Sequence, residues 1–363
     1  MKAFFQKLKD SKEDRVTNFR GLLSGLSPLF VLLVALLIGS ILIVISGQNP
    51  IEAYASLFLG AFGSLSRFSE TMIKAIPLLI MGLAISIAFK MGYWNIGGEG
   101  QFLVGATLST WVAITFSQLP AYLLSPLCFF AGFLGGAFWG GLSGFLKNRF
   151  NVSEVISTLM LNYVATFFVM YLIRGPMMDQ SAKISTGLVF PQTELIAEKL
   201  FLPILIERTR LHAGLFVSLI VLIFTWLLWR TKIGYSIEVS GANPEAARFA
   251  GINEKKITLF VSMLSGGLAG LVGWNEIFGV HHRLLDALTA GYGFQGIIVG
   301  LLGNLNPFGI AISSFLLSVL TVGGKAMERA TGIPFAVVDV INGTIIVFLL
   351  IRIALAKKIR GKI

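Results

Sequence analysis

The sequence predicts an all-α protein, a polytopic transmembrane helix bundle of about ten spans with broken helices. Apolar residues make up 55% of the 363 residues and charged residues only 13%, against about 25% in ordinary soluble domains. The mean hydropathy is +0.81. Long stretches carry no charged residue, and two of them, Glu99 to Lys147 and Asp286 to Lys325, can each hold two passes.

The predicted spans follow these charge-free stretches, because crossing the hydrocarbon takes about 20 mainly apolar residues. They are 27–46, 73–90, 99–117, 121–146, 153–173, 211–230, 257–278, 294–303, 308–323 and 334–353. Segment 294–303 is too short to cross, and Asn304, Asn306 and Pro307 follow it. We therefore expect a half-helix or part of a kinked pass there. In the fourth span, glycines 132, 135, 136, 140, 141 and 144 predict close helix packing.

The basic residues predict that both termini are cytoplasmic. On that topology 19 of the 29 Lys and Arg residues lie inside and 10 outside, as the positive-inside rule requires. The net charge of +11 then reflects topology, since no basic stripe with interleaved aromatics, typical of nucleic-acid binding, occurs outside the spans. No small-x-small cleavage site follows Ile45, which predicts an uncleaved first anchor.

One membrane domain accounts for the chain. It covers residues 27–353 and is flanked by a basic segment, 1–26, and a basic tail, 354–363, both expected in the cytoplasm. An outer loop is predicted at 174–210 and a cytoplasmic loop at 234–256. The single cysteine, Cys128, lies in a predicted span and cannot form an internal disulfide.

The loop 234–256 contains a short helix delimited by local signals. Asn243 can cap it, Pro244 suits its first turn, and Glu245 faces the positive end of the helix dipole. Gly251 can close it. A helix of about seven residues is too short to be stable alone in water. We therefore expect it to lean on something outside the segment, such as a partner subunit.

Two glycine-rich segments carry polar residues within the membrane region. In residues 91–102 four glycines permit sharp turns, and Asn95, Glu99 and Gln101 bring hydrogen-bonding groups to a place where unsatisfied ones are costly. Residues 291–307 repeat this pattern with Gln and Asn. Paired interrupted segments often flank the substrate of a transporter. The alternative for the first segment is a tight cytoplasmic turn whose Glu99 caps the next helix.

Enzyme and metal chemistry are not predicted. His212, His281 and His282 lack a metal-ligand spacing on one face, and the adjacent pair is typical of an exposed loop. The Gly-Gly-Lys-Ala run at 323–326 lacks the first glycine and the hydroxyl of a phosphate-binding loop. If ATP drives this protein, another chain binds it.

Three motifs, 95–101, 241–251 and 300–307, occur in the order in which they resemble the integral-membrane permease of a bacterial ATP-binding-cassette importer. The branch resembled is that of nucleoside and simple-sugar permeases, related to branched-chain amino-acid permeases, and the resemblance covers roughly residues 27–353. It implies a multi-pass subunit of the cytoplasmic membrane that is not an enzyme and binds no cofactor, with ATP and Mg used by a partner ATPase. The other implied partners are a second, usually different permease subunit and an extracytoplasmic substrate-binding lipoprotein.

The resemblance also implies that the short helix is the coupling helix, which seats in a groove of the ATPase. Apolar contacts are expected from its alanines and Phe249, and polar contacts at the rim from Glu245 and Arg248. The residues carried over are Asn243, Pro244, Glu245, Ala246, Ala247, Arg248 and Phe249.

A small polar solute, preferably a nucleoside, is the expected substrate, moved by alternating access. A nucleoside needs aromatic faces for its base and neutral polar partners for ribose. A simple sugar or a branched-chain amino acid stays open, the latter with Glu99 as partner of its ammonium. A proton-coupled secondary transporter using the intramembrane Asp339 is a further alternative. The candidate binding residues are Trp94, Asn95, Glu99, Gln101, Asn162, Tyr163, Phe294 and Gln295.

Overall fold

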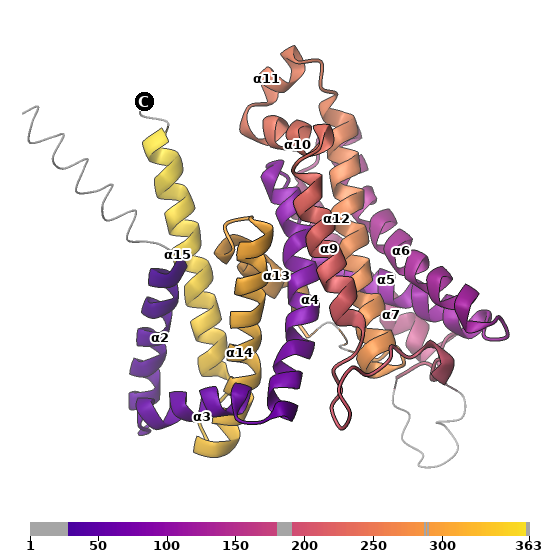
Figure 1. Cartoon of the computed structure of the whole chain (residues 1–363). Helices are drawn as coiled ribbons and strands as arrows, with labels where there is room; N and C mark the ends of the chain where they lie inside the picture. Colours follow the sequence, from indigo (N-terminus) through magenta and orange to yellow (C-terminus); the bar gives the residue numbers. More distant parts are fainter. Residues whose placement is uncertain (1–27, 180–190, 287, 289, 361–363) are drawn as a thin grey trace, which may run out of the picture. The chain divides into compact units, whose positions relative to one another are not determined.

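The computed structural model describes residues 28–179, 191–286, 288 and 290–360. It divides into two compact units (Figure 1): a terminal unit, Met1–Gly60 with Gly323–Ile363, and a central unit, Ala61–Val322. The predicted N-terminal segment 1–26 lies outside the described residues, as do positions 180–190 of the outer loop and 361–363 of the tail.

Helices form most of the described chain. The terminal unit contains α2 (Pro28–Ile45) and α15 (Ala336–Arg360), while α3 (Pro50–Phe62) and α14 (Pro307–Thr331) have residues in both units. The central unit contains α4 (Leu65–Lys90), α5 (Gly98–Thr115), α6 (Ala121–Phe150), α7 (Glu154–Arg174), a 3-10 turn (Glu198–Leu200), α9 (Gly214–Leu228), α10 (Lys232–Ala242), α11 (Pro244–Phe249), α12 (Glu254–Glu276), a π-helix (Ile277–His281) and α13 (Tyr292–Leu302).

The all-α prediction is confirmed, and each of the ten predicted apolar segments coincides with a helix. The helices α3 and α10 were not predicted. Helix α4 begins eight residues before its predicted span because the Ser64 hydroxyl caps it, accepting a hydrogen bond from the Arg67 N–H at 3.2 Å. Polar residues in that first turn hid it from a hydropathy criterion.

Fewer described helices than ten can cross a membrane alone. Five are long and apolar enough, or up to seven if each of two bent pairs counts as one span. The pairs are α2 with α3, bent by 118°, and α9 with α10, bent by 72°. Helix α13, the predicted half-helix, has 11 residues. Broken spans are therefore a feature of this fold.

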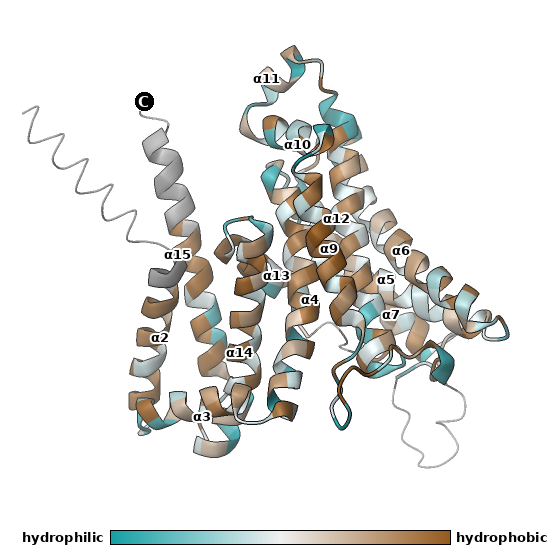
Figure 2. Cartoon of the chain, in the orientation of Figure 1, coloured by the Kyte–Doolittle hydropathy of each residue, from teal (hydrophilic) through white to brown (hydrophobic). Residues whose placement is uncertain are grey.

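Helix α12 lies at the centre of the central unit, where it packs against α6, α5 and α4. Figure 2 shows apolar residues along α4 and α9, with hydrophilic residues gathered around α11 and the start of α12. Glycines make the α6–α12 contact close: a Cβ atom at Gly136 would overlap the Gly266 carbonyl oxygen, and one at Gly270 would overlap the Gly132 carbonyl oxygen. The fourth predicted span therefore uses its glycines for packing, as expected.

The variant Gly136→Ala is expected to lower the stability of the permease by about 1–3 kcal/mol, because the added methyl group must push α6 and α12 apart. The thermal midpoint of the purified protein would measure this. Gly343→Ala is the matched control, since a Cβ atom at Gly343 in α15 meets nothing within 4 Å. Equal midpoints for the two variants would contradict the packing role of Gly136.

Candidate functional site

The two predicted glycine-rich segments meet beside the middle of α4. Helix α4 ends at Lys90, and the chain then turns back so that α5 starts at Gly98, next to Met81. A Cβ atom at Gly98 would lie 3.0 Å from the Met81 sulfur and 3.1 Å from the Gly293 Cα atom. The N-terminal ends of α5 and α13 thus abut here. We call Gly98, Glu99 and Gly293 the central junction.

A buried carboxylate joins the two helix ends at the central junction. The Gly293 N–H donates a hydrogen bond to Glu99 Oε1 at 2.9 Å, and Glu99 is only 7% exposed. The N-terminal turn of a helix has free N–H groups and a positive dipole end, which favour a negative charge. Glu99 lies in the first turn of α5 and contacts the first turn of α13. It therefore stabilises the N-terminal ends of both helices.

Asn95 and Gln101 form a side-chain pair at the turn before α5. Asn95 Nδ2 donates to Gln101 Oε1 at 3.0 Å, and Gln101 Nε2 donates to Asn95 Oδ1 at 2.9 Å. Asn95 Nδ2 also donates to the Ser265 hydroxyl of α12 at 2.9 Å. Both amides are buried, so in this conformation their polar atoms hold the turn against α12.

Asn162 braces the same turn from α7. Its Oδ1 accepts from the Gly100 N–H at 2.9 Å, and its Nδ2 donates to the Ile96 carbonyl at 2.9 Å. Together with the Asn95 pair, this fixes an irregular backbone whose groups would otherwise be unsatisfied within the membrane region.

The aromatic candidates are more accessible than the amides. Trp94 is 38% exposed and packs on Phe89, with ring centroids 4.7 Å apart. Phe294 is 47% exposed, and Gln295 is half-buried with its Nε2 3.5 Å from the Ala290 carbonyl. Tyr163 is also exposed. The predicted binding residues thus divide into a buried polar set and exposed aromatics, and their contact with substrate stays a prediction.

Helix α11 is delimited by the caps that the sequence predicted. The Asn243 side chain accepts from the N–H groups of Glu245 and Ala246 at 3.0 and 3.1 Å. At the other end the Gly251 N–H donates to the Arg248 carbonyl and the Ile252 N–H to the Ala247 carbonyl, which is the Schellman arrangement. Gly251 has a φ of +76° there, as its position after the helix requires.

The surface of α11 differs in part from the expected one. Phe249 is 94% exposed and Ala246 is also exposed, whereas Ala247 is fully buried and packs inside the loop. Arg248 donates two hydrogen bonds to Glu254 Oε2, from Nη2 at 2.8 Å and from Nε at 3.1 Å. The accessible apolar group of this helix is therefore Phe249, because an exposed phenyl ring offers far more contact area than a methyl group.

The loop carrying α11 rests directly on the end of α4. A Cβ atom at Gly241 in α10 would overlap the Lys90 carbonyl oxygen. Lys90 Nζ forms an ion pair with Glu238 at 2.6 Å and lies 4.1 Å from the Trp229 ring centroid. These contacts fix α10 to the start of the segment that leads to the central junction.

A second polar cluster, which the sequence did not predict, lies at the end of α12 far from α11. We call His212, Asn275, Glu276 and His282 the Glu276 cluster. Six of its side-chain atoms are buried without a hydrogen-bond partner in the described part of the chain: His212 Nε2, both polar atoms of Asn275, both Glu276 oxygens and His282 Nδ1. Unsatisfied buried polar groups cost about 1–3 kcal/mol each, so a cluster of them requires a cause.

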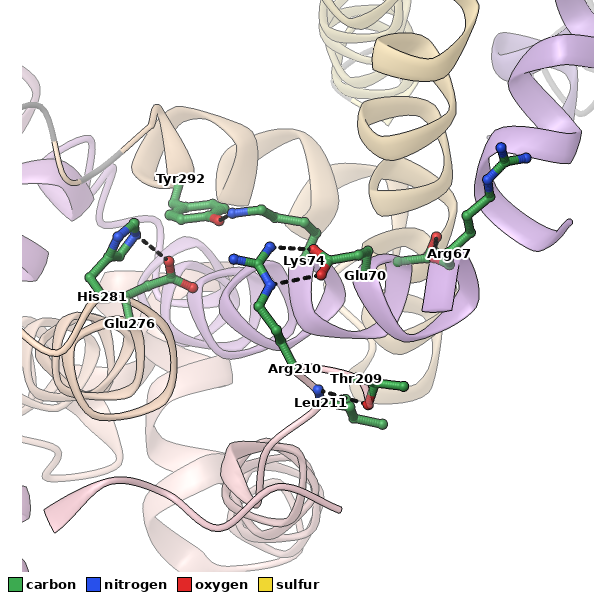
Figure 3. Close-up of polar contacts among 10 residues, drawn as sticks. Arg67, Glu70, Lys74, Thr209, Arg210, Leu211, Glu276, His281 and Tyr292 are labelled. Carbon is green, nitrogen blue, oxygen red and sulfur yellow. Dashed lines mark hydrogen bonds and ion pairs between the residues drawn. The ribbon is translucent and has the colours of Figure 1, made fainter. Parts of the chain in front are cut away.

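Figure 3 shows the surroundings of Glu276. Its Oε2 lies 3.5 Å from His281 Nε2. Arg210 turns instead to Glu70, with two hydrogen bonds of 2.8 and 2.9 Å. His281, predicted to belong to an exposed loop, is half-buried and ends the π-helix. The sequence signal that could have revealed this cluster is an amide and an acid at the end of an apolar run, followed closely by a histidine pair.

His212, in the loop just before α9, makes the stability of the folded chain depend on pH. Burial lowers its pKa from 6.5 to about 4, and the Glu276 charge opposes this only in part. The unfolded chain therefore binds a proton between pH 6.5 and 4 while the folded one does not, so stability falls as pH falls through this window. We expect the free energy of unfolding to be about 2 kcal/mol lower at pH 5 than at pH 7.5.

To test this pH dependence, the thermal midpoint of unfolding is measured at pH 7.5 and at pH 5 for the unaltered protein and for His212→Asn. Asparagine can still accept from the Gly214 N–H, which donates to His212 Nδ1 at 3.2 Å, but it does not titrate. The midpoint of the variant should fall less on acidification. An equal fall in both proteins would contradict the prediction.

An apolar cavity of about 760 Å³ lies between α5, α6 and α7. Trp111, Phe138 and Phe168 are among its lining residues. Of the predicted binding residues, none lines it, so it is separate from the central junction.

Comparisons with known proteins agree on one kind of protein. The chain is 36% identical over 332 residues to the glucose ABC transporter permease protein TsgB13 of Haloferax volcanii, covering 89% of this chain and 86% of that protein. It is 34% identical to the guanosine ABC transporter permease protein NupP of Bacillus subtilis, covering 89% and 92%. It is also 34% identical to the nucleoside ABC transporter permease protein NupB of Lactococcus lactis subsp. cremoris, covering 90% and 91%.

The family model described as branched-chain amino acid transport system, permease component, matches residues 67–350. This match runs from the first turns of α4 into α15 and includes the central junction, α11 and the Glu276 cluster. The chain therefore belongs to the family of branched-chain amino acid transport system permease components and is an ABC transporter permease.

Proposed function

We propose that this permease imports nucleosides, as the membrane-spanning subunit of an ATP-driven transporter that works by alternating access. The observation that carries the proposal is the 34% identity, over nine-tenths of the chain, to two permeases named for guanosine and nucleosides. The exposed rings of Trp94 and Phe294 support it, because an aromatic face is what a nucleobase stacks on.

The implied assembly has four kinds of component: this permease, a second and different permease subunit, a cytoplasmic ABC ATPase, and an extracytoplasmic substrate-binding lipoprotein. Both termini and α11 would lie on the cytoplasmic side, the more basic side of the membrane in the predicted topology. The exposed Phe249 on a capped helix supports docking of α11 to the ATPase. In this proposal the permease has no catalytic activity and binds no cofactor, and ATP with Mg acts in the ATPase.

The test is uptake of labelled adenosine or uridine by cells carrying the whole transporter, with a strain lacking this permease as the control. Unlabelled ribose and leucine serve as competitors. We expect uptake to be lost on deletion and to be unaffected by either competitor. Unchanged nucleoside uptake in the deletion strain would overturn the proposal.

A simple sugar is the second candidate, because the relative with 36% identity is named for glucose. Loss of labelled glucose or ribose uptake on deletion, without loss of nucleoside uptake, would favour it. Proton coupling through Asp339 has less support. This residue is exposed in the first turn of α15, where the helix dipole stabilises a carboxylate without any transport role.

A further inference from the structure

The Glu276 cluster is a set of hydrogen-bonding groups without partners. Glu276 is 1% exposed, Asn275 0% and His212 1%, yet His212 Nε2, both polar atoms of Asn275 and both Glu276 oxygens have no hydrogen-bond partner within the described residues. Buried polar groups are normally paired. Acceptors and donors that lie side by side without partners are therefore typical of a ligand site.

The donors and acceptors of the cluster are of defined kinds. His212 Nδ1 accepts from the Gly214 N–H at 3.2 Å, which leaves Nε2–H as the free donor. Asn275 Oδ1 lies directly over Gly214, where a Cβ atom would overlap it. Glu276 offers two acceptor oxygens, and its Oε2 lies 3.5 Å from the His281 Nε2 atom. A ligand here meets a carboxylate flanked by a neutral donor and an amide.

The charges around Glu276 favour a neutral ligand over a metal cation. Arg210 and Lys74 bring positive charge to this region but are already bonded, Arg210 to Glu70 and Lys74 Nζ to the Tyr292 hydroxyl at 2.6 Å. Figure 3 shows both of these residues around Glu276. Their field disfavours a further cation. Glu276 therefore remains available to accept hydrogen bonds from hydroxyl groups.

The backbone at the cluster is irregular. Directly after Glu276, α12 widens into a π-helix over Ile277–His281. Such π-helical turns are rare and occur frequently at functional sites. Within this turn, a Cβ atom at Gly279 would overlap the His212 ring, so a glycine admits the imidazole to the cluster. The irregular turn and the open polar atoms are independent features that coincide at one place.

We propose that the Glu276 cluster binds two adjacent hydroxyl groups on the sugar of the transported solute, Glu276 accepting one hydrogen bond from each hydroxyl. A carboxylate matches such a pair because its two oxygens accept in parallel. Asn275 and His212 then contact the remaining sugar oxygens. This assignment rests on the proposed function and adds the feature recognised, one that ribonucleosides and glucose share. The cluster is closed in this structure and opens in another state of the alternating-access cycle.

The test compares uptake of labelled adenosine, 2′-deoxyadenosine and 3′-deoxyadenosine by cells carrying the whole transporter with unaltered permease, Glu276→Gln or Glu276→Asp. The deoxy analogues each lack one hydroxyl of the pair, and a site built to bond a hydroxyl discriminates strongly against its loss. We expect Glu276→Gln to lower adenosine uptake at least about tenfold and uptake of the analogues less than about twofold. Because the binding protein is the same in all strains, a change in the ratio of adenosine uptake to deoxyadenosine uptake is caused by the permease.

Glu198→Gln is the matched control, since it removes an exposed carboxylate of the 3-10 turn, outside the Glu276 cluster, and it should leave the ratio of adenosine uptake to deoxyadenosine uptake unchanged. Permease amounts in the membrane are measured for every strain. Glu276→Asp retains a carboxylate and serves as a second variant in case Glu276→Gln misfolds. It should lower the ratio of adenosine uptake to deoxyadenosine uptake less than Glu276→Gln does. Equal loss of all three substrates, or an unchanged ratio, would overturn the assignment while leaving nucleoside import intact. No adenosine uptake by the unaltered transporter would overturn both.

Discussion

Replacing Arg248 and Phe249 together by alanine is expected to lower uptake at least about thirtyfold while the permease still enters the membrane. Phe249 is 94% exposed at the end of a capped helix, and a buried aromatic anchor at an interface contributes about 2 kcal/mol or more to binding. Arg248 adds a charged group beside it, paired within the loop to Glu254. In the proposed docking of α11 to the ATPase, the double variant would lack both the apolar contact and the polar rim.

The measurements are uptake and the amount of ATPase that co-purifies with the permease. Phe167→Ala is the matched control: it also removes an exposed phenyl ring, 66% exposed on α7, but far along the chain from α11. It should keep both quantities near normal. Normal uptake in the Arg248/Phe249 double variant would contradict the proposed role of α11 in coupling the permease to the ATPase.

The second large effect is expected from Gly293→Ala, which should lower uptake at least about tenfold. A Cβ atom at position 293 would overlap the Glu99 amide nitrogen at the start of α5. The neighbour is backbone and cannot rotate away, so α5 and α13 must separate and the 2.9 Å hydrogen bond between Gly293 and Glu99 is lost. The central junction would then lose both its close contact and its shared carboxylate.

The matched control is Gly300→Ala, on the same helix. There a Cβ atom would lie 3.5 Å from the Gly82 carbonyl oxygen, an ordinary contact, and uptake should change less than about twofold. Membrane amounts and thermal midpoints of both variants separate a transport defect from misfolding. If both variants transported normally, the contact of α5 with α13 would have no part in the transport cycle.

Local signals in the sequence predicted the elements that local chemistry determines. Asn243, Pro244 and Gly251 act within a few residues of themselves, so the helix they delimit was predicted with its caps. Charge-free runs identified the apolar helices for the same reason. The two glycine-rich segments were predicted to flank the substrate because their patterns are alike; their direct contact through Glu99 and Gly293 was not predicted, because it depends on tertiary packing.

Features that depend on distant packing could not be predicted. Asn95 and Gln101 were predicted to contact a solute; in this structure they bond each other, and Asn95 also bonds Ser265, 170 positions away along the chain. Glu276 marked the end of an apolar run in the sequence, and its burial, at 1% exposed, depends on tertiary packing that the run does not reveal. Helix α3 was hidden because Glu52 and its neighbours interrupt the apolar pattern.

The contact of Gly241 with the end of α4 has a mechanical consequence. Lys90 is held there by Glu238 and the Trp229 ring, and it precedes Glu99 by only nine positions in the sequence. The intervening residues are held in one conformation by the hydrogen bonds of the Asn95 pair and of Asn162, so they form a short rigid connection between α4 and α5. A tilt of α10 by an ATPase pressing on α11 would pull directly on the end of α5. Gating force could reach the middle of the membrane without bending a single long helix.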